Sequence, residues 1–147
     1  MRPLLFHFLM GAALLGPAAY GQNLDHSNLV VVARRDLDVD SLSKDQVTRI
    51  YLKQINTLPN GKPVEPLDLA EGSTIYQDFY AKVIGKTPVQ IRSYWSRQAF
   101  TGMAIPPRQY ASAAEVRQAL ANAPGSLAYL ARKDVNDQLK VLFDPNK

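Results

Sequence analysis

The chain has 147 residues, a formal net charge of +4 and no cysteine. The absence of cysteine excludes disulfides, thiol catalysis and cysteine-based zinc sites. Basic residues are scattered singly or in pairs among acidic ones, so we expect a mildly basic solvated surface and no nucleic-acid-binding face.

The first 21 residues have the pattern of a secretory signal peptide. Arg2 precedes an apolar run over residues 4–15, and residues 19–21 (Ala-Tyr-Gly) place small side chains where a signal peptidase reads them. As a helix, about twelve apolar residues would span about 18 Å of a hydrocarbon core about 30 Å thick. We therefore expect cleavage after residue 21 and a mature protein over 22–147, periplasmic or secreted and without a membrane span. A retained membrane anchor is the alternative.

Strand and helix patterns alternate after this segment. Residues 29–33 form a continuous apolar run that predicts a strand buried on both faces, the habit of parallel sheets. Residues 43–52 predict a helix, because Ser43 and Gln46 have the spacing of a capping box. Residues 64–69 predict a second strand, in which Pro66 favours a sheet edge or a strand start.

Two further helices are expected over residues 73–84 and 87–100. The first has apolar residues at four-residue spacing and ends at Gly85. The second opens with a capping box at Thr87 and Gln90. Both helices are rich in aromatic side chains, which we expect in the core rather than along a ligand groove; these are Tyr76, Phe79, Tyr80, Tyr94, Trp95 and Phe100.

The last third continues the alternation after an expected loop over residues 101–107. Ser112 and Glu115 predict a third capping box, starting a helix that ends at Pro124. Strands are expected over 127–130 and 139–143. Strands that alternate with helices imply one α/β domain whose sheet is covered on at least one face.

Enzyme chemistry has little support in the sequence. His26 is the only histidine left after the expected cleavage, so no histidine-rich metal site can form, and no base lies in an obvious place beside a serine. Residues 36–40 resemble the start of a calcium loop, but Ser41 and Val47 stand where that loop requires glycine and glutamate. We expect no catalysis, no cofactor and no metal.

Residues 68–74 connect a predicted strand to a predicted helix, with Gly72 directly before Ser73 and Thr74. At such a junction free N–H groups and the helix dipole converge on an anion. Gly72 would let the backbone approach, and the two hydroxyl groups could donate. The alternative is that Ser73 only caps the helix. The carboxylate of Glu71 favours this alternative, because it would repel phosphate.

Four segments resemble phosphate ABC-transporter substrate-binding proteins. Residues 41–52 are similar to the stretch S-L-S-x-x-x-V-x-x-I-F-L-G of that family, and residues 64–73 to its segment V-P-V-D-x-x-x-G-S. Residues 94–107 resemble the signature Y-W-S-R…F-T-G…P-P of a short, single-lobe branch. Residues 122–129 resemble N-x-P-G-A-I-G-Y.

The resemblance implies an α/β fold: a single periplasmic-binding-protein-like lobe with a mixed, mostly parallel sheet flanked by helices. It implies that Gly72, Ser73 and Thr74 form a half-site for phosphate or another oxyanion, in phosphate uptake or sensing. Full-size members grip phosphate between two lobes, so the implied partners are a transporter or envelope protein, or a second copy in a homodimer. Glu71 and Met103 depart from the family pattern. They favour the alternative of a cell-envelope interaction module that kept the fold and lost the ligand.

Overall fold

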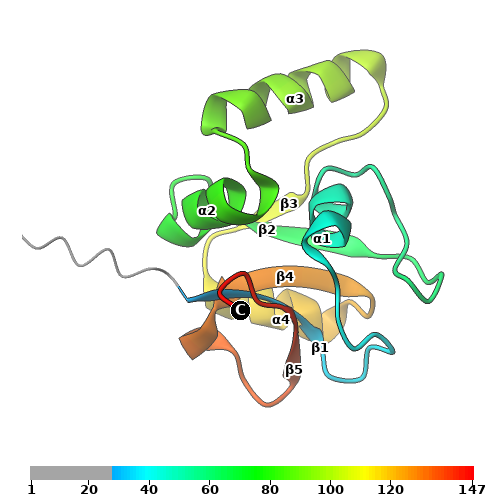
Figure 1. Ribbon diagram of the computed structural model, residues 1–147, viewed down its shortest axis with the longest axis vertical. Coiled ribbons are helices and arrows are strands. Elements are labelled where there is room, and N and C mark those ends of the chain that lie inside the picture. The colour runs from blue at the N-terminus through cyan, green and yellow to red at the C-terminus, as the bar shows by residue number, and fades with distance from the viewer. Residues whose placement is uncertain (1–27) are drawn as a thin grey trace, which may run out of the picture.

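A five-stranded sheet organises the part of the chain that the structure, a computed structural model, describes: residues 28–147 (Figure 1). The predictions for the signal peptide and His26 lie outside these residues. The strands are β1 (Leu29–Arg34), β2 (Glu65–Leu69), β3 (Arg108–Tyr110), β4 (Ser126–Ala131) and β5 (Leu139–Phe143). The helices are α1 (Lys44–Tyr51), α2 (Thr74–Phe79), π-helical η1 (Tyr80–Ile84), α3 (Pro88–Thr101), α4 (Ala113–Asn122) and the 3-10 turn η2 (Arg132–Asp134).

The sheet has the strand order β3-β2-β4-β1-β5. β2 pairs in parallel with β3 and β4, whereas β1 pairs antiparallel with β4 and β5, so every strand except β1 runs in the same direction. The expected mixed, mostly parallel α/β sheet is confirmed. The parallel setting expected for residues 29–33 is wrong, because the apolar run reflects a central, doubly covered position rather than strand direction.

Helices cover both faces of the sheet (Figure 1). α1 and α2 lie on one side and α4 on the other, while α3 stands farther out, beyond α2. Within residues 28–147 no helix is both long and apolar enough to cross a membrane.

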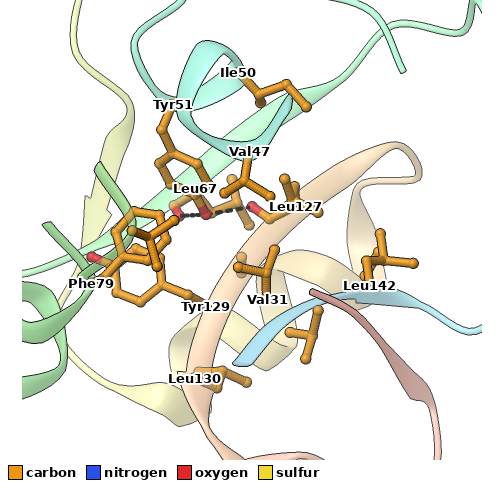
Figure 2. Close-up of a cluster of buried hydrophobic side chains, with 14 of the residues drawn as sticks. Val31, Val47, Ile50, Tyr51, Leu67, Phe79, Leu127, Tyr129, Leu130 and Leu142 are labelled. Carbon is orange, nitrogen blue, oxygen red and sulfur yellow. Dashed lines mark hydrogen bonds between the residues drawn. The ribbon is translucent and has the colours of Figure 1, made fainter. Parts of the chain in front are cut away.

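The core between α1, α2 and the sheet is built around three aromatic rings (Figure 2). The Phe79 ring stacks on Tyr129 with centroids 3.9 Å apart and meets Tyr51 at 4.6 Å. The Tyr51 hydroxyl donates to the carbonyl of Leu67 at 2.9 Å. These contacts fix α1 and α2 against β2 and β4, which positions the turn between β2 and α2.

The helix starts follow their capping residues. Ser43 and Thr87 each form the expected capping box, with Gln46 and Gln90. The third box is half wrong: the Ser112 hydroxyl accepts from the amide of Glu115, but the Glu115 carboxylate accepts from the amide of Ala111 instead of that of Ser112.

Three other local predictions differ from the structure. β2 is not an edge strand, and Pro66 is tolerated because pairing with β3 begins only at Leu67, which agrees with a strand start. The helix expected over residues 73–84 passes from α-helical to π-helical at Tyr80. Phe100 is 94% exposed rather than in the core, because it lies near the outer end of α3.

Candidate functional site

The turn between β2 and α2 holds the three predicted anion-binding residues. Its backbone is closed by a hydrogen bond from the Ser73 amide to the carbonyl of Ala70, at 2.9 Å. The Ser73 hydroxyl accepts from the Tyr76 amide at 3.2 Å, so Ser73 is the N-cap of α2. A capping serine accepts through its oxygen, and its hydroxyl hydrogen stays available to donate.

The first turn of α2 leaves two backbone donors free. The amides of Thr74 and Ile75 donate to no acceptor among residues 28–147, as expected for the first positions of a helix. Thr74 and Gly72 are exposed, and a Cβ placed on Gly72 would meet no atom within 4 Å. The predicted residues therefore lie together at an open helix start, where a small ligand can reach the backbone.

Charged side chains of η2, directly after β4, line the same region. An open hollow of about 790 Å³ is lined by Thr74, Ile75 and three charged residues, Arg132, Lys133 and Asp134. Arg132 is paired with Asp144, whereas Lys133 is exposed and forms no ion pair within the described residues. The start of α2 therefore lines the same hollow as Lys133, whose positive charge is not balanced by an ion pair within the described residues.

Glu71, which the sequence places against anion binding, has a partner. Its Oε1 accepts from Arg92 Nη1 of α3 at 2.9 Å. Both side chains are about half exposed, so the pair is screened by water. The charge of Glu71 is compensated on the α3 side of the turn.

Sequence reasoning missed the environment of Asp68, which is 3% exposed near the end of β2. One carboxylate oxygen accepts from the Tyr80 hydroxyl at 2.6 Å, and the other accepts from the Tyr129 hydroxyl and from the Leu69 amide. Burial raises the pKa of Asp68 to about 6, against the lowering effect of these hydrogen bonds. An acidic residue inside a predicted buried strand is the one signal that could have marked it.

No cluster of histidine, aspartate and glutamate side chains able to hold a metal ion occurs within residues 28–147. Around this turn, the available groups are hydrogen-bond donors at the α2 start and one buried carboxyl below it. Such an arrangement can bind and orient a small polar molecule.

Comparison with known proteins finds similarity at the level of structure alone. No family model and no curated protein matches the sequence. Among solved structures, an ABC-type phosphate transport receptor from Vibrio cholerae superposes with a TM-score of 0.64 and 15% identity, over 80% of this chain and 48% of that chain. PstS from Borrelia burgdorferi superposes with a TM-score of 0.58 and 13% identity, over 78% and 46%.

A third solved structure is described as a phosphate ABC transporter substrate-binding protein with bound phosphate, from Clostridium perfringens. It gives a TM-score of 0.62 and 12% identity, over 78% of this chain and 44% of that chain. The chain spans about half the length of the receptors it matches. It has the periplasmic-binding-protein-like fold of these phosphate receptors, over a region the size of one lobe.

Proposed function

We propose that the protein is exported by its N-terminal segment and works as a non-catalytic, solute-binding-like protein for phosphate or a similar oxyanion, in phosphate uptake or sensing. Gly72 allows close approach, and Ser73 and Thr74 donate to the anion. One observation carries the proposal: the amides of Thr74 and Ile75 are free at a helix start that shares a hollow with Lys133. A helix N-terminus with free amides favours negative charge.

The free energy available from hydrogen bonds limits how tightly this half-site binds an anion. Three charge-assisted hydrogen bonds contribute about 5–9 kcal/mol in sum. Association opposes them by about 4–15 kcal/mol before desolvation. The remainder is small, so we expect a dissociation constant of about 1 mM or weaker for the isolated chain.

Calorimetry tests this proposal with a matched pair of variants. Phosphate and sulfate are titrated into the mature protein, into Ser73→Ala and into Ser112→Ala. Both serines cap a helix by accepting from the third residue's amide at 3.2 Å, so both variants lose a comparable cap. We expect binding to weaken about fivefold or more in Ser73→Ala, the cost of one hydrogen bond, and to be unchanged in Ser112→Ala. No heat with millimolar anion, or equal weakening in the two variants, would contradict it.

Thr74→Val gives a second variant that keeps the Ser73 cap. The valine has the shape of threonine and lacks only the hydroxyl donor, and the exposed position tolerates the change. We expect anion binding to weaken while the thermal midpoint stays near that of the wild type. Unchanged binding would remove Thr74 from the site.

Tight capture would require a second wall facing the start of α2, from a second copy or from a transporter or envelope protein. Sedimentation of the mature protein with and without phosphate tests whether a second copy supplies this wall. A doubling of mass with phosphate assigns the wall to a homodimer, and an unchanged monomer excludes the homodimer.

A second candidate function is a cell-envelope interaction module that retains the fold without the ligand. It is favoured by the exposed apolar side chains Phe100, Met103 and Ile105, which are 94%, 77% and 76% exposed at and after the outer end of α3. Contiguous exposed apolar surface marks interaction sites. Crosslinking from position 103 in the cell envelope should then capture a partner even in Ser73→Ala, and recovery of no crosslinked product would count against this function.

A further inference from the structure

A separate hollow lies on the α3 side of the turn, where β2, α2, η1 and α3 meet. Its volume is about 310 Å³, at the small end of the range for ligand sites. The side chains that matter for its chemistry are Asp68, Glu71, Tyr76, Tyr80, Arg92 and Trp95. None of these six residues lines the hollow shared by Thr74 and Lys133.

The charges of this hollow are predominantly negative. Asp68 and Glu71 both contribute to its lining, and the guanidinium of Arg92 is already paired with Glu71. Asp68 is held by three neutral donors, two tyrosine hydroxyls and one amide, and by no cation. When Asp68 is ionised, its negative charge is therefore not balanced by any ion pair within residues 28–147.

Tyr76 supplies a polar group that no protein atom satisfies. The residue is only 5% exposed and its ring packs on Tyr80 with centroids 4.4 Å apart. Its hydroxyl forms no hydrogen bond with any described residue. Burial, and then the charges of Asp68 and Glu71, raise the pKa of Tyr76 to about 12, so the hydroxyl stays protonated at neutral pH. No fully buried polar side-chain atom among residues 28–147 lacks a partner, so the unpaired Tyr76 hydroxyl reaches solvent and is open to a ligand or water.

Trp95 adds an aromatic wall. It is 9% exposed, is the only tryptophan of the chain, and lines the hollow together with Tyr76 and Tyr80. The faces of tryptophan and tyrosine rings attract cations, most strongly where water is excluded. Aromatic rings beside carboxylates suit a ligand with a positive charge and an apolar body.

Other ligand classes fit less well. An oxyanion would meet the carboxylates of Asp68 and Glu71 with no free cation to offset them. A metal ion lacks a third carboxylate or histidine, since no such group of three occurs in the described part of the chain. A purely apolar ligand would leave the Tyr76 hydroxyl unpaired, at a desolvation cost.

We propose that this hollow binds a small organic ammonium ion, whose N–H groups donate to the Tyr76 hydroxyl oxygen and the carboxylates of Asp68 and Glu71, and whose alkyl part lies on Trp95. This site is distinct from the anion half-site at Gly72, Ser73 and Thr74 and does not depend on it.

The fluorescence of Trp95 is a built-in reporter for the test. Butylammonium, 1-butanol and butyrate, which are similar in size and differ in charge, are titrated at pH 7.5 into the mature protein. We expect a saturable change in Trp95 emission with butylammonium and none with the other two at equal concentration. An equal response to 1-butanol would overturn the proposal by showing an apolar pocket only, and no saturable response to butylammonium would overturn it directly.

Two variants test which side chains contact the ammonium ion. Tyr76→Phe removes one hydroxyl and should weaken butylammonium binding about fivefold, and the half-exposed Glu71→Gln, which leaves the core untouched, should weaken it similarly. Ser112→Ala, which removes the cap of α4 and does not line the hollow, should bind butylammonium like the wild type. Unchanged affinity in both Tyr76→Phe and Glu71→Gln, or displacement of butylammonium by phosphate, would overturn the site.

Discussion

Asp68 is expected to make the stability of the protein depend on pH. Its pKa is raised from 3.8 to about 6 by burial, so between these values the folded state holds a proton that the unfolded state has released. This stabilisation is fully present below about pH 4 and is lost as the pH rises through about 6. A shift of about two pKa units corresponds to about 3 kcal/mol.

Urea unfolding at pH 4, 5, 6 and 7 measures this effect in the wild type and in Asp68→Asn. The free energy of unfolding should fall with rising pH in the wild type more steeply than in the variant, which has no proton to lose. Equal pH dependence in the two proteins would show that Asp68 titrates as an ordinary surface carboxyl.

The hydroxyl of Tyr80 should stabilise the charged form of Asp68 in particular. It donates to the Asp68 carboxylate at 2.6 Å, and hydrogen bonds to charged groups contribute about 1.5–3 kcal/mol against about 1 for neutral ones. Tyr80→Phe should therefore cost more free energy of unfolding at pH 7.5 than at pH 4. Tyr110→Phe is the control, because its hydroxyl has no partner among residues 28–147, and it should change little at either pH. A loss in Tyr80→Phe that is independent of pH would contradict the assignment.

Residue identity predicted the helix start but not its surroundings. The helix start after Ser73 is predicted correctly because a serine directly before a helical pattern is a local signal for an N-cap. The setting of Asp68 depends on Tyr129, which lies 61 positions away in the chain. Such a contact leaves no periodic trace in the sequence, so this part of the site could be found only in the structure.

The helix α3 has few ties to the rest of the fold. It is attached through the buried side chains of Ile91 and Trp95, the ion pair of Arg92 and a hydrogen bond from the Tyr94 hydroxyl to the carbonyl of Leu52 at 2.6 Å. Few buried contacts and exposed backbone lower the free energy of local opening. We expect the amides of α3 to exchange hydrogen faster than those of β1 and β4.

Tyr94→Phe tests this attachment. Loss of one hydrogen bond should speed exchange in α3 about fivefold and leave β4 unchanged. The same increase throughout the sheet would mean that α3 unfolds only with the whole domain, contrary to this expectation.

At the scale of helices and strands, short-range sequence signals explain which elements were predicted correctly. Elements without such signals were missed or given the wrong direction. The capping boxes at Ser43 and Thr87 depend on contacts within four residues, and both helices begin where expected. β3 has three residues, none of them fully buried, so it shows no apolar alternation and was not predicted as a strand. The direction of β1 depends on which strands flank it, which an apolar run does not encode.

At the scale of the whole molecule, the proposed anion site and the proposed ammonium site lie in two separate hollows on different sides of the turn between β2 and α2. The chain spans 48% of the Vibrio cholerae receptor. The overall α/β class followed from alternating patterns in the sequence. The outward position of α3, and with it the hollow beneath, did not, because it depends on long-range packing.

Amide chemical shifts in a phosphate titration test the anion site most directly. With ¹⁵N-labelled mature protein at constant ionic strength, we predict saturable shifts that are largest at Gly72, Thr74 and Ile75, with a dissociation constant of about 1 mM or weaker. Shifts that are absent at tens of millimolar phosphate, or largest in another part of the molecule, would contradict binding at the start of α2.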